Sequence, residues 1–146
     1  MDGAMFQGSS ALSLDAKGRL TIPTRYRTTL LVEEDGCLTL TRHPDGCLIL
    51  YPRSVWEQKR EQIAALPISA RALQRLMLGS AQDVDIDSAG RILIAPELRQ
   101  AAGLQKNTML LGLGGHFELW DAQLLEIRQT EDLAQGLPEA LEQFSL

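Results

Sequence analysis

The pattern of apolar and polar residues along this chain occurs twice. Residues 14–23 read apolar, Asp, two variable residues, Gly-Arg, a short apolar run and a proline. Residues 86–96 read the same, with one extra residue before the proline. At a similar distance after each copy comes a Gly-led apolar run that ends in an aromatic residue, at residues 46–51 and 115–120. We interpret this repeated order as an internal duplication whose two copies act jointly.

Short alternating runs predict β-strands on both sides of the first Gly-Arg motif. Residues 10–14 and 20–22 alternate between polar and apolar side chains, so residues 15–19 are predicted to form the turn of a β-hairpin. Gly18 is expected to supply a positive φ, and Asp15 to accept hydrogen bonds from N–H groups of the turn. Further strands are expected at residues 38–40, 47–51, 108–113 and 116–120.

Proline and glycine positions predict short helices between these strands. Pro23 and Pro96 each open a helix, because proline at the first helical position lacks an N–H that would have no partner there, and Gly103 ends the second helix. Residues 54–57 have the form of a capping box for a helix that Pro67 ends. Further helix caps are expected at Ser69 and Asp121.

The length of 146 residues suits one domain whose two halves share a core, since each half alone would bury too little surface. From the repeats and the helical spans we predict four segments. They are a first repeat over residues 9–55, a helical connector over 56–80, a second repeat over 81–124 and an acidic helical tail over 125–146.

Charge is divided unevenly along the chain. The net charge of −5 argues against binding nucleic acid through the overall field of the protein. Residues 1–80 contain ten Lys/Arg against eight Asp/Glu, whereas residues 81–146 contain four against eleven. An anionic partner is therefore expected to contact mainly the first copy. The basic residues predicted to make that contact are Lys17, Arg19, Arg25, Arg27 and Arg91.

No set of residues in the sequence predicts an enzyme. The duplicated Asp invites comparison with the paired carboxylates of aspartic proteases, but Asp15 and Asp87 are not followed by the hydroxyl residue and Gly of such sites. The glycine-rich residues 112–115 lie between two predicted strands and are expected to form a hairpin turn, not a phosphate-binding loop. His43 and His116 have no nucleophile motif. We therefore expect no small-molecule substrate.

No metal or other cofactor is expected either. The spacing of Cys37 and Cys47 matches no zinc signature, and two histidines are a poor supply of ligands. These cysteines are expected to be small buried apolar residues. Four aromatic residues are likewise expected in the core or in subunit contacts, because no Lys or Arg alternates with them as a base-stacking surface would require. They are Tyr51, Trp56, Phe117 and Trp120.

No apolar run approaches the ~20 residues of a membrane-spanning helix. The first residues, 1–6, do not resemble a signal peptide. We therefore expect a cytoplasmic protein that does not bind membranes.

Six motifs over about residues 5–120 carry a resemblance to a known family. They are Met5-Phe6-Gln7-Gly8, Asp15-Ala16-Lys17-Gly18-Arg19, Pro23-Thr24-Arg25-Tyr26-Arg27, Arg75-Leu76-Met77-Leu78-Gly79, Gly90-Arg91-Ile92-Leu93-Ile94-Ala95-Pro96 and Phe117-Glu118-Leu119-Trp120. In these motifs the chain resembles the MraZ family of bacterial regulators associated with the division and cell-wall gene cluster.

This resemblance implies an α+β, mainly β fold. Two AbrB-like swapped-hairpin motifs in one chain would interleave into a β-barrel with connecting helices. It also implies a transcriptional regulator that forms ring-shaped homo-oligomers on the nucleoid. These would bind tandem short repeats in double-stranded promoter DNA, including the gene's own promoter. The alternative is an oligomeric interaction protein whose basic turns bind an acidic protein partner.

Overall fold

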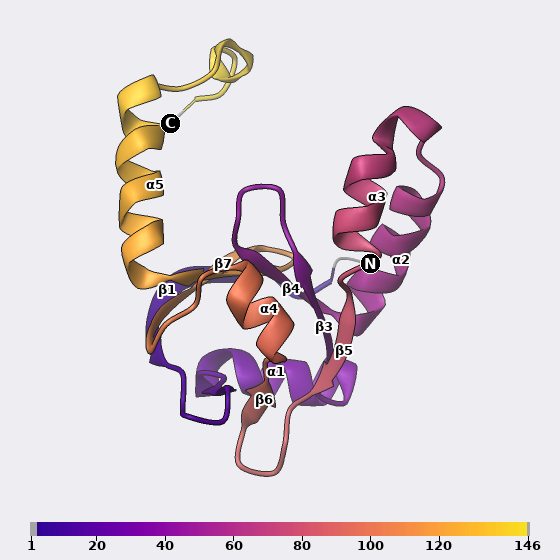
Figure 1. Cartoon of the computed structure of the whole chain (residues 1–146), viewed down its shortest axis with the longest axis vertical. Coiled ribbons are helices and arrows are strands. Elements are labelled where there is room, and N and C mark those ends of the chain that lie inside the picture. The colour runs from indigo at the N-terminus through magenta and orange to yellow at the C-terminus, as the bar shows by residue number, and fades with distance from the viewer. Residues whose placement is uncertain (1–2, 146) are drawn as a thin grey trace.

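A six-stranded antiparallel sheet and a two-stranded ribbon form the centre of the fold (Figure 1). The computed structural model describes residues 3–145. Across the sheet the strands lie in the order β1 (Phe6–Ser13), β7 (Asn107–Gly114), β8 (Phe117–Asp121), β4 (Leu48–Pro52), β3 (Cys37–Arg42) and β5 (Gln82–Asp85). The ribbon consists of β2 (Arg19–Thr21) and β6 (Arg91–Leu93).

The strands that lead into the two Gly-Arg loops find their partners in the opposite half of the chain. β1 pairs with β7, and β5 pairs with β3. The ribbon likewise joins the two halves, because β2 pairs with β6. The predicted hairpin over residues 10–22 is therefore wrong in its pairing, although its turn is correct. β2 pairs across the repeat because its central Leu20 and the central Ile92 of β6 are then both buried.

Five α-helices and two short 3₁₀ helices lie among residues 3–145. They are α1 (Thr24–Glu34), α2 (Arg53–Ala64), α3 (Arg71–Met77), α4 (Pro96–Ala101) and α5 (Ala122–Gln135), with the 3₁₀ segments Ile68–Ala70 and Glu139–Leu141. Figure 1 shows α2 and α3 packed side by side as a pair, while α5 projects from the sheet.

The predicted helix boundaries are correct where proline, glycine or aspartate sets them. α1 directly follows Pro23, α4 begins at Pro96, and Gly103 with φ +63° follows its end. Asp121 caps α5 by accepting a hydrogen bond from the Leu124 N–H at 3.2 Å.

The two predicted serine caps are wrong. Ser54 lies inside the first turn of α2, and its N–H and hydroxyl both donate to the carboxylate of Glu34 at 2.9 and 2.7 Å. Ser69 lies within a 3₁₀ segment that has no side-chain cap. The Ser54 hydroxyl binds Glu34 instead of the helix start, and Ser69 makes no cap hydrogen bond. The spacing of residues around each serine in the sequence does not reveal this.

The main core is built where the two halves meet. Phe117 of β8 is fully buried, with its ring centroid 4.4 Å from that of Phe6 and 5.0 Å from that of Tyr26. A second cluster packs α2 and α3 against the sheet around Trp56 and Tyr51. Trp120 is also buried, so the core interpretation of the predicted aromatic residues is confirmed.

The predicted α+β class is confirmed, with the strands at the centre of the fold. Whether they close into a barrel stays a prediction, because the strand order is that of an open sheet beside a ribbon. Within residues 3–145, every helix is too short or too polar to cross a lipid bilayer.

The cap of α5 gives a first testable prediction. Asp121 is 5% exposed, and its second carboxylate oxygen accepts the Gln105 N–H at 3.2 Å. Asp121→Ala removes both acceptors and is expected to lower the free energy of unfolding by about 1–2 kcal/mol. Urea denaturation of the two proteins measures this difference. Asp132→Ala, at an exposed position on the same helix, is the control, and an equal loss in both variants would refute the capping role.

Candidate nucleic-acid interface

The β2–β6 ribbon presents one buried and one outward face. Leu20 and Ile92 are 0% and 1% exposed and point into the core. Because side chains alternate along a strand, their neighbours Arg19 and Thr21 share the opposite face. Arg19 pairs with Leu93, and Thr21 with Arg91, so all four side chains lie on that outward face. The ribbon therefore displays two arginines, one from each repeat, about 7 Å apart along the strand direction.

Each arginine is held by the aspartate that opens its own loop. The Asp15 carboxylate accepts the N–H groups of Lys17 and Arg19 at 2.9 and 2.8 Å, and its other oxygen binds Arg19 Nε at 2.7 Å. Asp87 accepts the N–H groups of Ala89 and Arg91, both at 2.9 Å, and binds Arg91 Nε at 3.1 Å. The prediction that Asp15 organises the turn is confirmed.

The aspartates orient the two arginines but bind only part of each guanidinium. Among the hydrogen bonds of residues 3–145, those of Arg19 and Arg91 to the aspartates use only Nε of each guanidinium. The Nη groups are the ends of the guanidinium that bind planar acceptors in pairs. Each arginine side chain is about one-third exposed, at 31% for Arg19 and 32% for Arg91.

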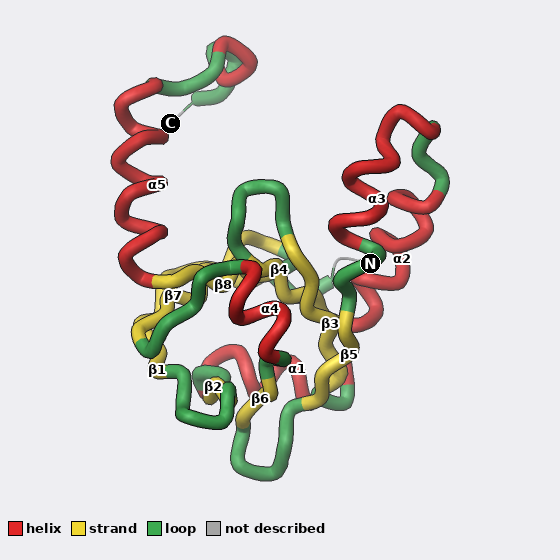
Figure 2. The backbone as a smooth tube through the Cα atoms, viewed as in Figure 1, coloured by secondary structure: helices red, strands yellow, loops and turns green. Residues whose placement is uncertain are grey.

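The two loops are locked together by a mutual exchange of contacts. The Ile94 N–H donates to the Gly18 carbonyl at 2.8 Å, and the Ile22 N–H donates to the Gly90 carbonyl at 2.9 Å. Both glycines have positive φ, +84° and +82°, which confirms the expectation for Gly18. Figure 2 shows the loops beside β2 and β6 at one end of the molecule.

The helices that follow the ribbon strands also contact the loop of the other repeat. Arg27 of α1 lies against Gly90, and Arg99 of α4 lies against Gly18, each so closely that a Cβ on the glycine would collide with the guanidinium. Arg99 Nε also donates to the Ile94 carbonyl at 3.0 Å. Arg99 was not among the predicted contact residues. Aligning the two repeats by their loop aspartates, Asp15 and Asp87, gives an offset of 72 residues and makes Arg99 equivalent to Arg27. Aligning them by Pro23 and Pro96 gives an offset of 73 residues and hides this equivalence.

The remaining predicted residues are placed differently. Lys17 is exposed within the first loop. Arg25 lies on α1 beside β1, where it donates to the Ser10 hydroxyl and its Cζ lies 4.7 Å from the centre of the Tyr26 ring. Four of the predicted residues therefore lie at the ribbon or its loops, namely Lys17, Arg19, Arg27 and Arg91. Arg25 instead contacts β1.

The two ends of the ribbon differ in charge. At the 72-residue offset, Lys17 of the first loop corresponds to Ala89, and Arg25 of α1 corresponds to Glu97 of α4. The first repeat therefore carries two more positive groups and one fewer negative group than the second at these positions. This charge difference favours the first loop as the contact for an anionic partner.

The loop aspartates make stability depend on pH. Hydrogen bonds from the N–H groups of Arg19 and Arg91, aided by the guanidinium groups, hold the pKa of Asp15 and of Asp87 below its usual value. A lowered folded-state pKa adds stability above the unfolded pKa of about 4, and this is lost as the pH falls through the folded pKa.

The double variant Asp15→Asn/Asp87→Asn is therefore expected to show a smaller loss of stability below about pH 4 than the parent protein. Urea denaturation at a series of pH values measures this slope. Substituting the exposed α5 carboxylates instead, as Glu131→Gln/Asp132→Asn, is the control and should leave the slope nearly unchanged. Parallel curves for the parent and the loop variant would contradict this assignment.

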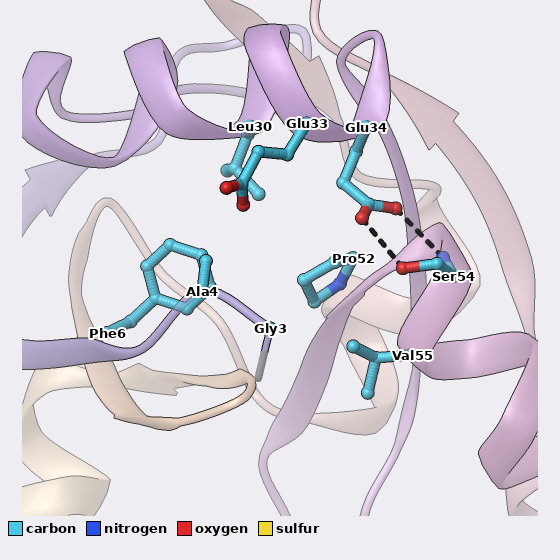
Figure 3. Close-up of a pocket in the computed structure, with 9 residues that line it drawn as sticks. All are labelled: Gly3, Ala4, Phe6, Leu30, Glu33, Glu34, Pro52, Ser54 and Val55. Atoms are coloured by element: carbon cyan, nitrogen blue, oxygen red, sulfur yellow. Dashed lines mark hydrogen bonds between the residues drawn. The ribbon is translucent and has the colours of Figure 1, made fainter. Parts of the chain in front are cut away.

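A pocket of about 340 Å³ lies between the N-terminal segment, the end of α1 and the start of α2 (Figure 3). Phe6, Leu30 and Val55 form its apolar lining, and Glu33 and Glu34 bring carboxylates to it. Glu34 is engaged by Ser54, as Figure 3 shows. Two carboxylates repel phosphate, and no nucleophile with an adjacent base lines the pocket among the described residues.

A group of metal-ligand side chains lies elsewhere in the described residues. His43, Cys47 and Glu118 come together at the turn between β3 and β4. Cys37 is not part of this group, and it is partly exposed. The cysteine spacing alone could not identify the group, because its third member comes from the other half of the chain.

The fold and the ribbon define a two-repeat α+β protein that presents one arginine loop from each repeat. Comparison with known proteins gives a more specific class. The model of the MraZ family, described as "MraZ protein, putative antitoxin-like", matches residues 5–76 and again 77–143. The chain belongs to the MraZ family.

Its relatives carry a functional name. The chain is 69% identical over 141 residues to the transcriptional regulator MraZ of Bordetella pertussis, covering 97% of this chain and 99% of that protein. The proteins of the same name from Herminiimonas arsenicoxydans and Burkholderia mallei are 61% and 59% identical over the same length and coverage. The protein is accordingly a transcriptional regulator, and the prediction that it is not an enzyme is confirmed.

Proposed function

We propose that this protein is a sequence-specific DNA-binding regulator of the division and cell-wall gene cluster. It binds tandem repeats in double-stranded promoter DNA, including its own promoter, as a ring-shaped homo-oligomer on the nucleoid in the cytoplasm. The observation that carries this proposal is the outward face of the ribbon. There Arg19 and Arg91 are oriented by aspartates and keep their Nη groups available.

A two-stranded ribbon is one of the two elements that fit the major groove of B-DNA. Arg19 is the residue proposed to read a base edge, because guanine offers two acceptors to the ends of a guanidinium. Lys17, Arg25, Arg27 and Arg91 are proposed to contact phosphates or flanking bases. Phosphate contacts set the position of the protein on the duplex, and base contacts set its sequence preference.

The two repeats are proposed to interleave as AbrB-like swapped hairpins around a barrel-like core. The pairing of β1 with β7 and of β5 with β3 supports this arrangement. So do the reciprocal hydrogen bonds of Gly18 and Gly90. In this scheme residues 9–55 and 81–124 are the repeats, 56–80 connect them, and 125–146 form the tail. The interleaving makes one rigid platform from two loops.

A single subunit offers few phosphate contacts and carries a net charge of −5, so its own affinity for DNA is low. Assembly into an oligomer raises the affinity for DNA. Once one subunit is bound, the contacts of the other subunits are intramolecular, and this avidity increases the overall affinity by a factor of about 10²–10⁴. Exposed apolar side chains on α5 support subunit contacts, with Ile127 56% and Leu133 83% exposed. The repeated promoter elements then reflect the symmetry of the ring.

Salt dependence distinguishes this function from the alternative, an oligomer that binds an acidic protein partner. The expected result is a steep linear fall of log affinity for the protein's upstream DNA against log salt concentration, with a slope set by the number of phosphates contacted. Fluorescence anisotropy between 50 and 300 mM potassium chloride, about the range in which such slopes are measured, provides the test. A flat response would favour the protein partner.

A further inference from the structure

A cysteine, a histidine and a glutamate meet at the end of the molecule opposite the β6 loop. His43 and Cys47 lie on either side of the β3–β4 turn, and Glu118 lies on β8; these three strands are labelled in Figure 2. One ligand atom of each lies within 4.8 Å of the other two. Imidazole, thiolate and carboxylate are the three ligand types that bind Zn²⁺ in proteins.

The backbone holds these three residues in place without any added ion. The His43 N–H donates to the Cys47 carbonyl at 3.0 Å, and the Gly46 N–H donates to the His43 carbonyl at 2.9 Å. Glu118 pairs with Ile49 in the β4–β8 register. Because the donors converge already, an ion binding there would have to order little of the chain.

Outer contacts orient two of the three side chains, as is usual around metal ligands. The Trp120 Nε1–H donates to Glu118 Oε1 at 2.8 Å, which leaves Oε2 free of that bond. Asp45 Oδ2 lies 3.6 Å from His43 Nδ1, which now accepts the Asp45 N–H. In the other tautomer that carboxylate can accept the Nδ1 proton, leaving Nε2 for a metal.

The thiol is the group that selects the kind of ion. Cys47 is only 2% exposed, and its thiol carries one proton. A metal that binds sulfur replaces this proton, which passes to solvent. Thiolate favours Zn²⁺ and related ions over Mg²⁺ and Ca²⁺, which prefer oxygen ligands alone.

We propose that His43, Cys47 and Glu118 form a binding site for a divalent transition metal of the Zn²⁺ class, with water as the fourth ligand. The site is separate from the ribbon and its proposed DNA contacts. It joins the two family-matched halves, because the β3–β4 turn belongs to residues 5–76 and β8 to residues 77–143. Metal binding would thus add a link between β4 and β8, which already pair in the sheet.

Isothermal titration of the reduced full-length protein with zinc chloride tests the site. The expected result is one Zn²⁺ bound per chain, with a rise in melting temperature and a change in the fluorescence of the neighbouring Trp120. Titration with Co²⁺ should add the absorption of a thiolate-to-metal charge transfer. Absence of stoichiometric Zn²⁺ binding to the intact protein would overturn the proposal.

Variants identify the ligands. Cys47→Ala, His43→Gln and Glu118→Gln are each expected to weaken Zn²⁺ binding by at least about 100-fold, since even outer contacts around a metal contribute 10–100-fold. Cys37→Ala is the matched control and should bind as the parent does.

Should Cys47→Ala fail to fold by circular dichroism, His43→Gln decides, because that side chain is one-quarter exposed and its replacement leaves the core intact. Full binding by His43→Gln, or equal losses in Cys37→Ala, would contradict the assignment.

Discussion

The protein with Arg19→Ala is expected to lose binding to its upstream promoter DNA by at least about 100-fold. One arginine that reads a base edge is worth about 1–3 kcal/mol of discrimination. Because a ring of subunits would engage several DNA repeats at once, the loss at each loop compounds across the complex. Anisotropy titration of the parent and variant with the same labelled fragment measures the change.

Two controls separate loss of contact from loss of structure. Arg60→Ala removes an exposed arginine from α2, away from the ribbon, and is expected to bind DNA nearly as the parent does. Light scattering should give the same particle mass for Arg19→Ala and the parent. Parent-like DNA affinity in Arg19→Ala would overturn the assignment of the ribbon, whereas a collapsed oligomer would assign Arg19 to assembly.

Gly90→Ala is expected to lower the free energy of unfolding by about 2–4 kcal/mol. A residue other than glycine at φ +82° is strained, at a cost of about 1–3 kcal/mol. The added Cβ would also lie 1.6 Å from Arg27 Nη1, so the guanidinium must move from its packed position. Urea denaturation monitored by circular dichroism measures the loss.

The steric part of this loss can be isolated within the same chain. Gly46 has φ +95°, and apart from its own chain neighbours no heavy atom lies within 4 Å of a Cβ placed there, so Gly46→Ala reports the conformational strain alone. Combining Gly90→Ala with Arg27→Ala removes the side chain that collides, and should recover about 1–2 kcal/mol relative to the sum of the single variants. Equal effects at Gly90 and Gly46, with no coupling to Arg27, would refute the proposed loop exchange.

Local signals in the sequence were sufficient for much of the fold. Pro96 and Gly103 mark the ends of α4, because their backbone preferences act within a few residues. Asp15 and Gly18 likewise specify the first loop through contacts confined to residues 15–19. The family motifs then led to the transcriptional regulator class.

Pairing between the repeats could not be predicted in the same way. Alternation at residues 10–14 and 20–22 is compatible with a hairpin, and only burial of Leu20 beside Ile92 makes β6 the better partner for β2. Arg99 was missed for a related reason. Its role depends on contact with Gly18, 81 positions away in the chain, and aligning the repeats by their prolines hid its equivalence to Arg27.

The central claim is that a weak cationic ribbon gains useful DNA affinity only when many copies are held in a fixed array. It is tested most directly by measuring affinity for DNA fragments with one to four promoter repeats, alongside the particle mass by analytical ultracentrifugation. We expect an oligomer whose affinity rises steeply with repeat number. A monomer that binds one repeat as tightly as four would contradict the account.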